Sequence, residues 1–210
     1  MMTGLHCGRA CHRYSIDREI RMSKGDETRE KMIETATRLF QSQGYAATGL
    51  KQILTESGTP RGSLYFHFPE GKEELAAEVV ARHGEVFGQA LEEVMNASPD
   101  AAQAAQQIVD LLARQCEATG CQTGCPVGAI AFEMANTSER LQRATREVFE
   151  RWSAIFARCL SNEGMSSAEA RQRAHAVICA IEGALILSRA YGDIGIFYDV
   201  RERLPALLSD

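Results

Sequence analysis

The sequence predicts an all-α fold of about nine helices, and three observations support this. Apolar residues recur with a helical period along most of the chain, and no alternating apolar and polar segment is long enough to predict a strand. Ser, Thr, Gly and Pro stand between the periodic segments, where they are typical of helix starts and stops. With 210 residues, 45% of them hydrophobic, the chain can form one large domain or a small domain joined to a larger one.

Charge, hydropathy and cysteine usage narrow the class of protein. The formal net charge of -5 excludes a protein that binds polyanions over its whole surface. Residues 1–75 carry a net +1 and residues 76–210 a net -6, which fits DNA binding confined to the N-terminal end. No run of 18 apolar residues predicts a membrane span, and no apolar h-region in residues 1–25 predicts a secretory signal. Seven cysteines without a disulfide framework favour a reducing cytoplasm.

Residues 1–25 are slightly basic and have no helical period, so we expect a flexible arm, with Met22 as an alternative start of the protein. Two cysteines and two histidines in the arm also allow a metal site: His6, Cys7, Cys11 and His12. No second ligand cluster with the spacing of a zinc finger follows, and this favours the arm without a metal.

The first predicted helix covers residues 26–43 and is strongly amphipathic. Its apolar face contains Met32, Ile33, Ala36, Leu39 and Phe40. Acidic residues in its first turns suit the positive end of the helix dipole, and a glycine follows its last residue. We expect this helix to brace the next two helices, which are too short to be stable alone.

Residues 48–68 predict two short helices joined by a tight turn. The second of these helices covers residues 61–67. The boundary signals are, in order, an N-cap, a left-handed C′ residue, a second N-cap, a first-turn proline and a proline that ends the second helix: Thr48, Gly58, Thr59, Pro60 and Pro69. This layout is typical of a helix-turn-helix that reads DNA.

Six further helices are predicted. A connector of roughly 25 residues opens at residues 70–74 and continues to about residue 96, a length of about 38 Å. Helices over residues 101–119 and 127–135 follow, then one capped by Thr137 or Ser138 that ends near residue 161. A capping box at residues 166–169 opens the most apolar helix, which ends near residue 191. The last helix covers residues 196–208 and allows a kink or restart near Pro205.

Residues 30–75 resemble the N-terminal domain of the tetracycline-repressor (TetR) family of bacterial transcription regulators. The resemblance rests on residues 36–40, Gly44-Tyr45, Thr48, Ile53, Ser57-Gly58, residues 62–65, His67-Phe68 and residues 72–75. One departure is a longer link after Phe68, Pro69-Glu-Gly-Lys72. Together with Gly124-Cys-Pro126-x-Gly128, this link resembles the branch that contains the LmrA and YxaF drug-resistance regulators.

The resemblance implies a DNA-binding regulator, most often a repressor, rather than an enzyme. It implies a DNA-binding domain at residues 26–75 and a regulatory and dimerisation domain at residues 76–210. The expected partners are a double-stranded DNA operator, an unidentified small-molecule inducer and a second copy of the chain. The motifs of enzymes are lacking, since the sequence shows no Gly-rich phosphate loop and no nucleophile or metal-binding motif, and no cofactor is expected.

Carried over residue by residue, the resemblance implies a set of DNA contacts: Thr48, Lys51, Thr59, Arg61, Gly62, Ser63, Tyr65, His67 and Lys72. Arg61 is the main candidate for reading a guanine, with a phosphate contact as its alternative. Gly62 lets the backbone approach the groove closely. His67 contacts phosphate or packs against the first helix, and Lys72 resembles a phosphate clamp.

The ligand pocket is expected among the middle helices, where apolar walls meet few polar anchors. The candidates are Phe132, Glu133, Met134, Phe149, Trp152 and Phe156. Glu133 could anchor a cationic drug or face solvent, and each aromatic residue could instead belong to the core. The last two long helices are the dimer surface that the resemblance implies, although a monomer core would also explain their apolar stripe.

Cys121 and Cys125 suggest an alternative, a thiol- or metal-sensing regulator with the same DNA-binding domain. Two thiolates do not fill a tetrahedral zinc site. Cys116 could supply a third ligand, but no nearby histidine completes the set. Buried or incidental thiols are therefore the favoured interpretation.

Overall fold

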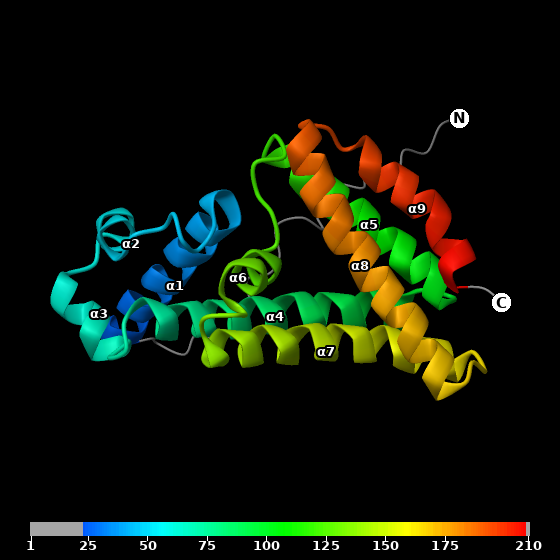
Figure 1. The fold of residues 1–210 in the computed structure, drawn as a ribbon, viewed down its shortest axis with the longest axis horizontal. Helices are drawn as coiled ribbons and strands as arrows, with labels where there is room; N and C mark the ends of the chain where they lie inside the picture. The colour runs from blue at the N-terminus through cyan, green and yellow to red at the C-terminus, as the bar shows by residue number, and fades with distance from the viewer. Residues whose placement is uncertain (1–22, 209–210) are drawn as a thin grey trace, which may run out of the picture.

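The computed structural model describes residues 23–208, so the predictions for residues 1–22 lie outside it. Its described part contains helices and no strand, which confirms the all-α prediction. The nine helices of residues 23–208 are α1 (Lys24–Gln43), α2 (Leu50–Ser57), α3 (Arg61–His67), α4 (Lys72–Ala97), α5 (Ala101–Ala118), α6 (Pro126–Met134), α7 (Glu139–Asn162), α8 (Ser167–Tyr191) and α9 (Gly195–Leu208) (Figure 1).

Helix α1 braces the two short helices, as the sequence predicts. Its five predicted apolar residues are all buried, and α1 contacts α2, α3, α4 and α6. The helix begins two residues earlier than expected because Ser23 and Asp26 form a capping box. In it, the Asp26 amide donates to Ser23 Oγ at 3.2 Å and the Ser23 amide donates to the Asp26 carboxylate at 3.2 Å.

The boundary signals of α2 and α3 are confirmed at Gly58 and corrected at Thr48, Thr59 and Pro60, which was expected inside the first turn of α3 and is its N-cap. Gly58 is left-handed (φ 65°, ψ 25°), and the Thr59 amide reaches back to the Leu54 carbonyl at 3.1 Å. The two threonine caps were wrong: Gly49 and Pro60 occupy the cap positions, without side-chain cap bonds. Each threonine hydroxyl bonds elsewhere, that of Thr48 donating to the Gly44 carbonyl at 2.7 Å and that of Thr59 lying 2.7 Å from Ser57 Oγ.

Helix α4 joins the N-terminal helices α1–α3 to the rest of the molecule. Its 26 residues extend about 39 Å. It lies alongside α7, and the two helices run in the same direction. Glu85 on α4 pairs with Arg151 on α7, and seven residues further along both helices Glu92 pairs with Arg158. The N-terminal part of α4 packs on α1, so a single rigid element belongs to both halves of the protein (Figure 1).

Helices α5, α8 and α9 pack together at the other end of the molecule (Figure 1). Pro205 lies inside α9 without breaking it. The predicted capping box before α8 forms only in part: Ser166 Oγ accepts from the Glu169 amide at 3.4 Å, and the Glu169 carboxylate instead pairs with Arg173.

Helix α8 is long and apolar enough to cross a membrane, with a mean hydropathy of 1.3. Length and composition alone are weak indications, since core helices of globular proteins share both. One side of α8 packs on α7 and α9, while the rest of its apolar surface is left exposed.

Candidate DNA-binding surface and ligand pocket

Helices α2 and α3 present an exposed polar surface beside a shallow groove of about 520 Å³. The groove is lined by Leu50, Lys51, Leu54, Thr55, Thr59, Arg61, Leu64 and Tyr65. Lys51, Arg61 and Gly62 are exposed, Tyr65 is half-exposed and Ser63 is partly buried. Nothing lies within 4 Å of where a Cβ on Gly62 would stand, so its backbone is open to close approach. The surface therefore brings together five of the nine predicted DNA contacts.

Two predicted contacts are buried in the domain instead. Thr48 has no exposed surface, and its hydroxyl accepts from Gln43 Nε2 at 3.1 Å while donating to the Gly44 carbonyl. Thr59 is 8% exposed, and its hydroxyl pairs with that of Ser57. Both side chains fix the ends of α2, and this geometry offers neither hydroxyl to a phosphate.

Lys72 is also turned inward. Its ammonium lies 3.9 Å from the centre of the Tyr45 ring and donates to the Tyr45 carbonyl at 2.5 Å. Burial lowers the pKa of this ammonium, and the nearby Glu133 carboxylate opposes the shift. Lys72 therefore ties α4 to the loop after α1, an arrangement that the resemblance did not imply.

Phe66 and His67 are the last two residues of α3. The His67 ring lies near the N-terminal turn of α1, about 3.8 Å from where a Cβ on Gly25 would stand, which agrees with packing on the first helix. Phe66 is 78% exposed and packs edge-on against His67, with ring centres 4.9 Å apart. The exposure of Phe66 was not predictable from the sequence, because a helix of seven residues is too short to show which side is buried.

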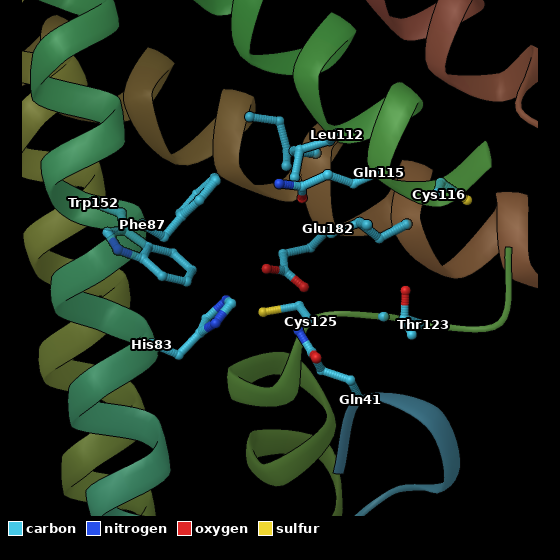
Figure 2. A pocket seen from close by; sticks show the side chains of 13 residues that line it. Gln41, His83, Phe87, Leu112, Gln115, Cys116, Thr123, Cys125, Trp152 and Glu182 are labelled. Carbon is cyan, nitrogen blue, oxygen red and sulfur yellow. The ribbon is translucent and has the colours of Figure 1, made fainter. Parts of the chain in front are cut away.

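A second feature is a pocket of about 70 Å³ between the DNA-binding domain and the body. It is lined by residues of α1, α4, α5, α7, α8 and the loop before α6: Gln41, His83, Phe87, Leu112, Gln115, Cys116, Thr123, Gly124, Cys125, Trp152, Ile181, Glu182 and Leu185 (Figure 2). Of the six predicted ligand residues, only Trp152 is among them.

The other predicted ligand residues lie elsewhere. Phe132 is 93% exposed on the outside of α6. Phe149 packs edge-on against Trp152 with ring centres 5.6 Å apart, and Phe156 is fully buried in the core. Met134 is partly buried against the same core. Of the two helices that carry the six predicted residues, α7 lines the pocket and α6 does not. Helical periodicity does not distinguish core residues from residues that line a pocket.

Glu133 neither lines this pocket nor faces solvent freely. Its carboxylate accepts from the backbone amides of Tyr45 at 3.2 Å and Ala46 at 2.5 Å, just after α1. These two amides lie in an irregular loop, and the carboxylate supplies the partner that they lack. Glu133 therefore fastens the body to the DNA-binding domain.

Two further contacts hold the end of α1 beside the pocket. The Gly124 amide donates to the Gln41 carbonyl at 3.0 Å, and the Arg189 guanidinium donates to the same carbonyl at 3.1 Å and to that of Ser42. The Gln41 side chain meanwhile lines the pocket. Helix α1 thus ends at the pocket wall.

Three polar side chains face the centre of the pocket among its apolar walls: His83, Cys125 and Glu182 (Figure 2). Burial lowers the pKa of His83 to about 4, so its imidazole is neutral near pH 7. Burial raises the pKa of Glu182, although a hydrogen bond from Cys125 opposes this. Burial, followed by the adjacent Glu182 charge, raises the pKa of Cys125 well above its usual range. The sequence prediction missed His83 and Glu182.

The structure separates the two cysteines of the thiol-sensing alternative. Cys121 interacts with Cys116, and burial together with this contact raises the pKa of Cys116 to about 12. Cys125 interacts instead with Glu182. Raised pKa values disfavour the reactive thiolate. Among residues 23–208, no group of three or more His, Cys, Asp or Glu side chains is placed to hold a metal ion.

Comparison with known proteins identifies both halves of the chain. Residues 32–79 match the model for bacterial regulatory proteins of the tetR family, and residues 101–203 match the C-terminal domain of LmrA/YxaF-like transcriptional regulators. These are the family and the branch expected from the resemblance.

Two relatives from Bacillus subtilis are each 42% identical to the chain. The uncharacterised HTH-type transcriptional regulator YxaF aligns over 186 residues, 89% of this chain and 97% of that protein. The HTH-type transcriptional regulator LmrA aligns over 188 residues, 90% of this chain and 100% of that protein. Both are described as transcriptional regulators, in line with the prediction of a regulator rather than an enzyme.

Solved structures share the fold. A TetR transcriptional regulator from Legionella pneumophila superposes with a TM-score of 0.79 at 24% identity, covering 90% of this chain and 100% of that one. The reduced form of Escherichia coli NemR superposes with a TM-score of 0.75 at 20% identity, covering 87% and 97%. At this identity, the likeness concerns the fold alone.

Proposed function

Because the chain belongs to the TetR family of DNA-binding transcriptional regulators, we propose that it is a repressor released from its operator by a small molecule. The observation that carries this proposal is the double role of Gln41. Its side chain lines the pocket, and its carbonyl is held by Gly124 and Arg189. A ligand that enters the pocket must therefore contact or displace the end of α1, which braces the DNA-reading helices.

On the DNA side, we propose that α3 enters the major groove with Arg61 at a base edge. Lys51 and Tyr65 then lie at the flanks, where they suit phosphate contacts, and Gly62 allows the backbone to approach. Phosphate contacts would supply most of the affinity and its salt dependence, and base contacts would supply specificity. Of the nine contacts implied by the resemblance, the proposal leaves out Thr48, Thr59 and Lys72.

We also propose a homodimer through α8 and α9. Ile186, Leu187 and Tyr191 are exposed on α8, and Tyr198 and Leu207 are exposed on α9. A wide exposed apolar surface of this kind is typical of a protein interface. A two-fold dimer would place its two α3 helices at half-sites about 34 Å or a multiple of that apart.

The test starts from DNA. Fragments of the host genome are selected on the purified protein, and the bound fragment is then used in an anisotropy titration against a compound library. We expect at least one compound to lower the protein's affinity for that fragment. The same compound should leave the protein's affinity for non-specific DNA unchanged. Failure to select any specific fragment would contradict the DNA-binding role, and selection without any releasing compound would contradict the ligand-responsive part.

A further inference from the structure

The pocket contains a partly buried acid, Glu182, which has no cationic partner among residues 23–208. Glu182 lies on α8, and its carboxyl interacts with the Cys125 thiol. A thiol is a weak hydrogen-bond donor and does not compensate a carboxylate for lost water. Figure 2 shows the carboxyl directed into the pocket, toward the side where His83, Phe87 and Trp152 lie. A carboxylate that loses part of its water without gaining a cation is costly to the fold, so the position of Glu182 suits an external partner.

The other polar groups do not supply that partner. Because burial lowers the pKa of His83 to about 4, its imidazole is uncharged near pH 7 and does not act as a cation toward Glu182. The Arg189 guanidinium is already engaged with the Gln41 and Ser42 carbonyls. The wall opposite the carboxyl is aromatic, with Phe87 and Trp152 packed edge to face at 4.8 Å.

The local backbone is shaped to admit the carboxyl. On α6, Gly128 stands directly against it, and a Cβ at this position would lie 2.6 Å from Glu182 Oε2. A Cβ at position 128 would require this carboxyl, the far end of a flexible side chain, to shift. The glycine therefore permits the close approach, which places Glu182 beside the Cys125 thiol at the start of α6.

We propose that this pocket is a subsite for the cationic head of a small organic ligand, a protonated amine or an amidinium, with Glu182 as its counter-ion. The N–H groups of the head donate to the Glu182 carboxylate, which a planar amidinium can engage with two parallel hydrogen bonds. The aromatic faces of Phe87 and Trp152 attract the same positive charge. Since the cavity is about 70 Å³, it holds a head group, and the remainder of the ligand extends past the exposed Gln115. The inference deepens the proposed function and rests on it for its regulatory meaning.

Trp152 makes the test direct, because it is the single tryptophan of the chain and lines the pocket. Its fluorescence is followed while full-length protein is titrated with benzamidinium or with benzamide, which has nearly the same shape and no charge. We expect benzamidinium to bind at least tenfold more tightly than benzamide. Equal affinities, or tighter binding of benzamide, would overturn the proposal.

Two variants locate the counter-ion. Glu182→Gln keeps the shape of the side chain, removes the charge and should abolish the preference for benzamidinium. Glu117→Gln makes the same change at an exposed position on α5 and should leave the preference intact. A preference that survives in Glu182→Gln would overturn the assignment. If that variant does not fold, the comparison of the two probes on the unmodified protein still decides the question.

The operator fragment separates this inference from the proposed function. If the protein binds a specific DNA fragment but shows no preference for benzamidinium, the proposed subsite is contradicted and the DNA-binding role is still supported. A Glu182-dependent preference that leaves DNA affinity unchanged supports the subsite and contradicts release by occupancy of this pocket.

Discussion

The Glu133 carboxylate on α6 accepts a hydrogen bond from the backbone amide of Ala46 at 2.5 Å, across 87 residues of sequence. The same carboxylate accepts from the Tyr45 amide, so one side chain fixes the loop that connects α1 to α2. Hydrogen bonds to a charged acceptor are stronger than neutral ones. The loop between α1 and α2 is therefore held by a side chain from the C-terminal half of the protein.

Replacing Glu133 should loosen that loop. Glu133→Ala leaves two backbone amides without their acceptor, and we expect a loss of about 1–3 kcal/mol in the free energy of unfolding. Amide hydrogen exchange at positions 45 and 46 should accelerate at least tenfold. Exchange in the middle of α4 should accelerate only as far as the loss of global stability accounts for. Unchanged exchange at these two amides would show that the carboxylate does not hold the loop in solution.

Arg61 and Lys51 should differ in how they affect DNA binding. If Arg61 reads a base, Arg61→Ala should cost about 1–3 kcal/mol on the operator and relax the preference at one base pair. Lys51→Ala should weaken binding to all sequences alike and reduce the salt dependence by about one counterion. Titrations of operator variants at several salt concentrations measure both effects. A phosphate role for Arg61 would appear as an unchanged base preference.

Lys72 is predicted to matter for stability more than for DNA. The ammonium packs on the Tyr45 ring and donates to its carbonyl. Lys72→Met should therefore lower the free energy of unfolding by about 1–2 kcal/mol. The salt dependence of DNA binding should stay the same. If the salt slope of DNA binding instead falls by about one in Lys72→Met, the result would support the phosphate contact by Lys72 that the resemblance implies.

The sequence predicts most of the fold because its signals are local. Gly58 and Ser138 mark the end of α2 and the start of α7 as predicted, since a left-handed glycine and an N-cap serine act within one helical turn. Thr48 was misjudged because a threonine hydroxyl can equally bond a preceding carbonyl, and only the packed loop decides which.

The pocket was harder to predict because it is assembled from distant segments. His83 and Glu182 are 99 positions apart and meet only when α4 and α8 pack around the loop before α6. One signal was present in the sequence: Glu182 is the single acidic residue between positions 170 and 192, within the most apolar helix. An acid in such a stretch is rarely buried without a purpose. Trp152 was predicted because a large aromatic residue on a middle helix suits both a core and a pocket wall.

His83 should make the protein less stable in acid. Its pKa falls from 6.5 to about 4 on folding, because burial disfavours the charged imidazole. Between these values the unfolded chain binds a proton that the folded protein does not, so stability falls as the pH drops from 6.5 to 4. The full effect of this shift is about 3 kcal/mol. Glu182 and Cys125 face His83 across the pocket. Burial raises the pKa of Glu182, which acts in the opposite sense, so its contribution to the stability of the protein is lost as the pH rises above 4.5.

Two histidine variants isolate this effect. Urea unfolding of His83→Gln across pH 4–7 should show a shallower loss of stability in acid than the unmodified protein. His175→Gln, which changes an exposed imidazole on α8, should follow the unmodified protein. Parallel curves for all three proteins would mean that His83 is not buried as a neutral group.

The exposed face of α8 gives the last prediction. Ile186 is 66% exposed there, close to Gly183, whose Cβ position has nothing within 4 Å. If a second copy covers this face, Ile186→Glu buries an unpaired charge at the interface, and we expect a cost of about 3 kcal/mol, a roughly 100-fold rise in the dimer dissociation constant. Sedimentation equilibrium measures that constant. Val86→Glu is the matched control, since Val86 is 53% exposed on α4, where it lines a groove with residues of α1, and should leave the dimer intact. Equal dissociation constants for the two variants would place the interface elsewhere on the molecule.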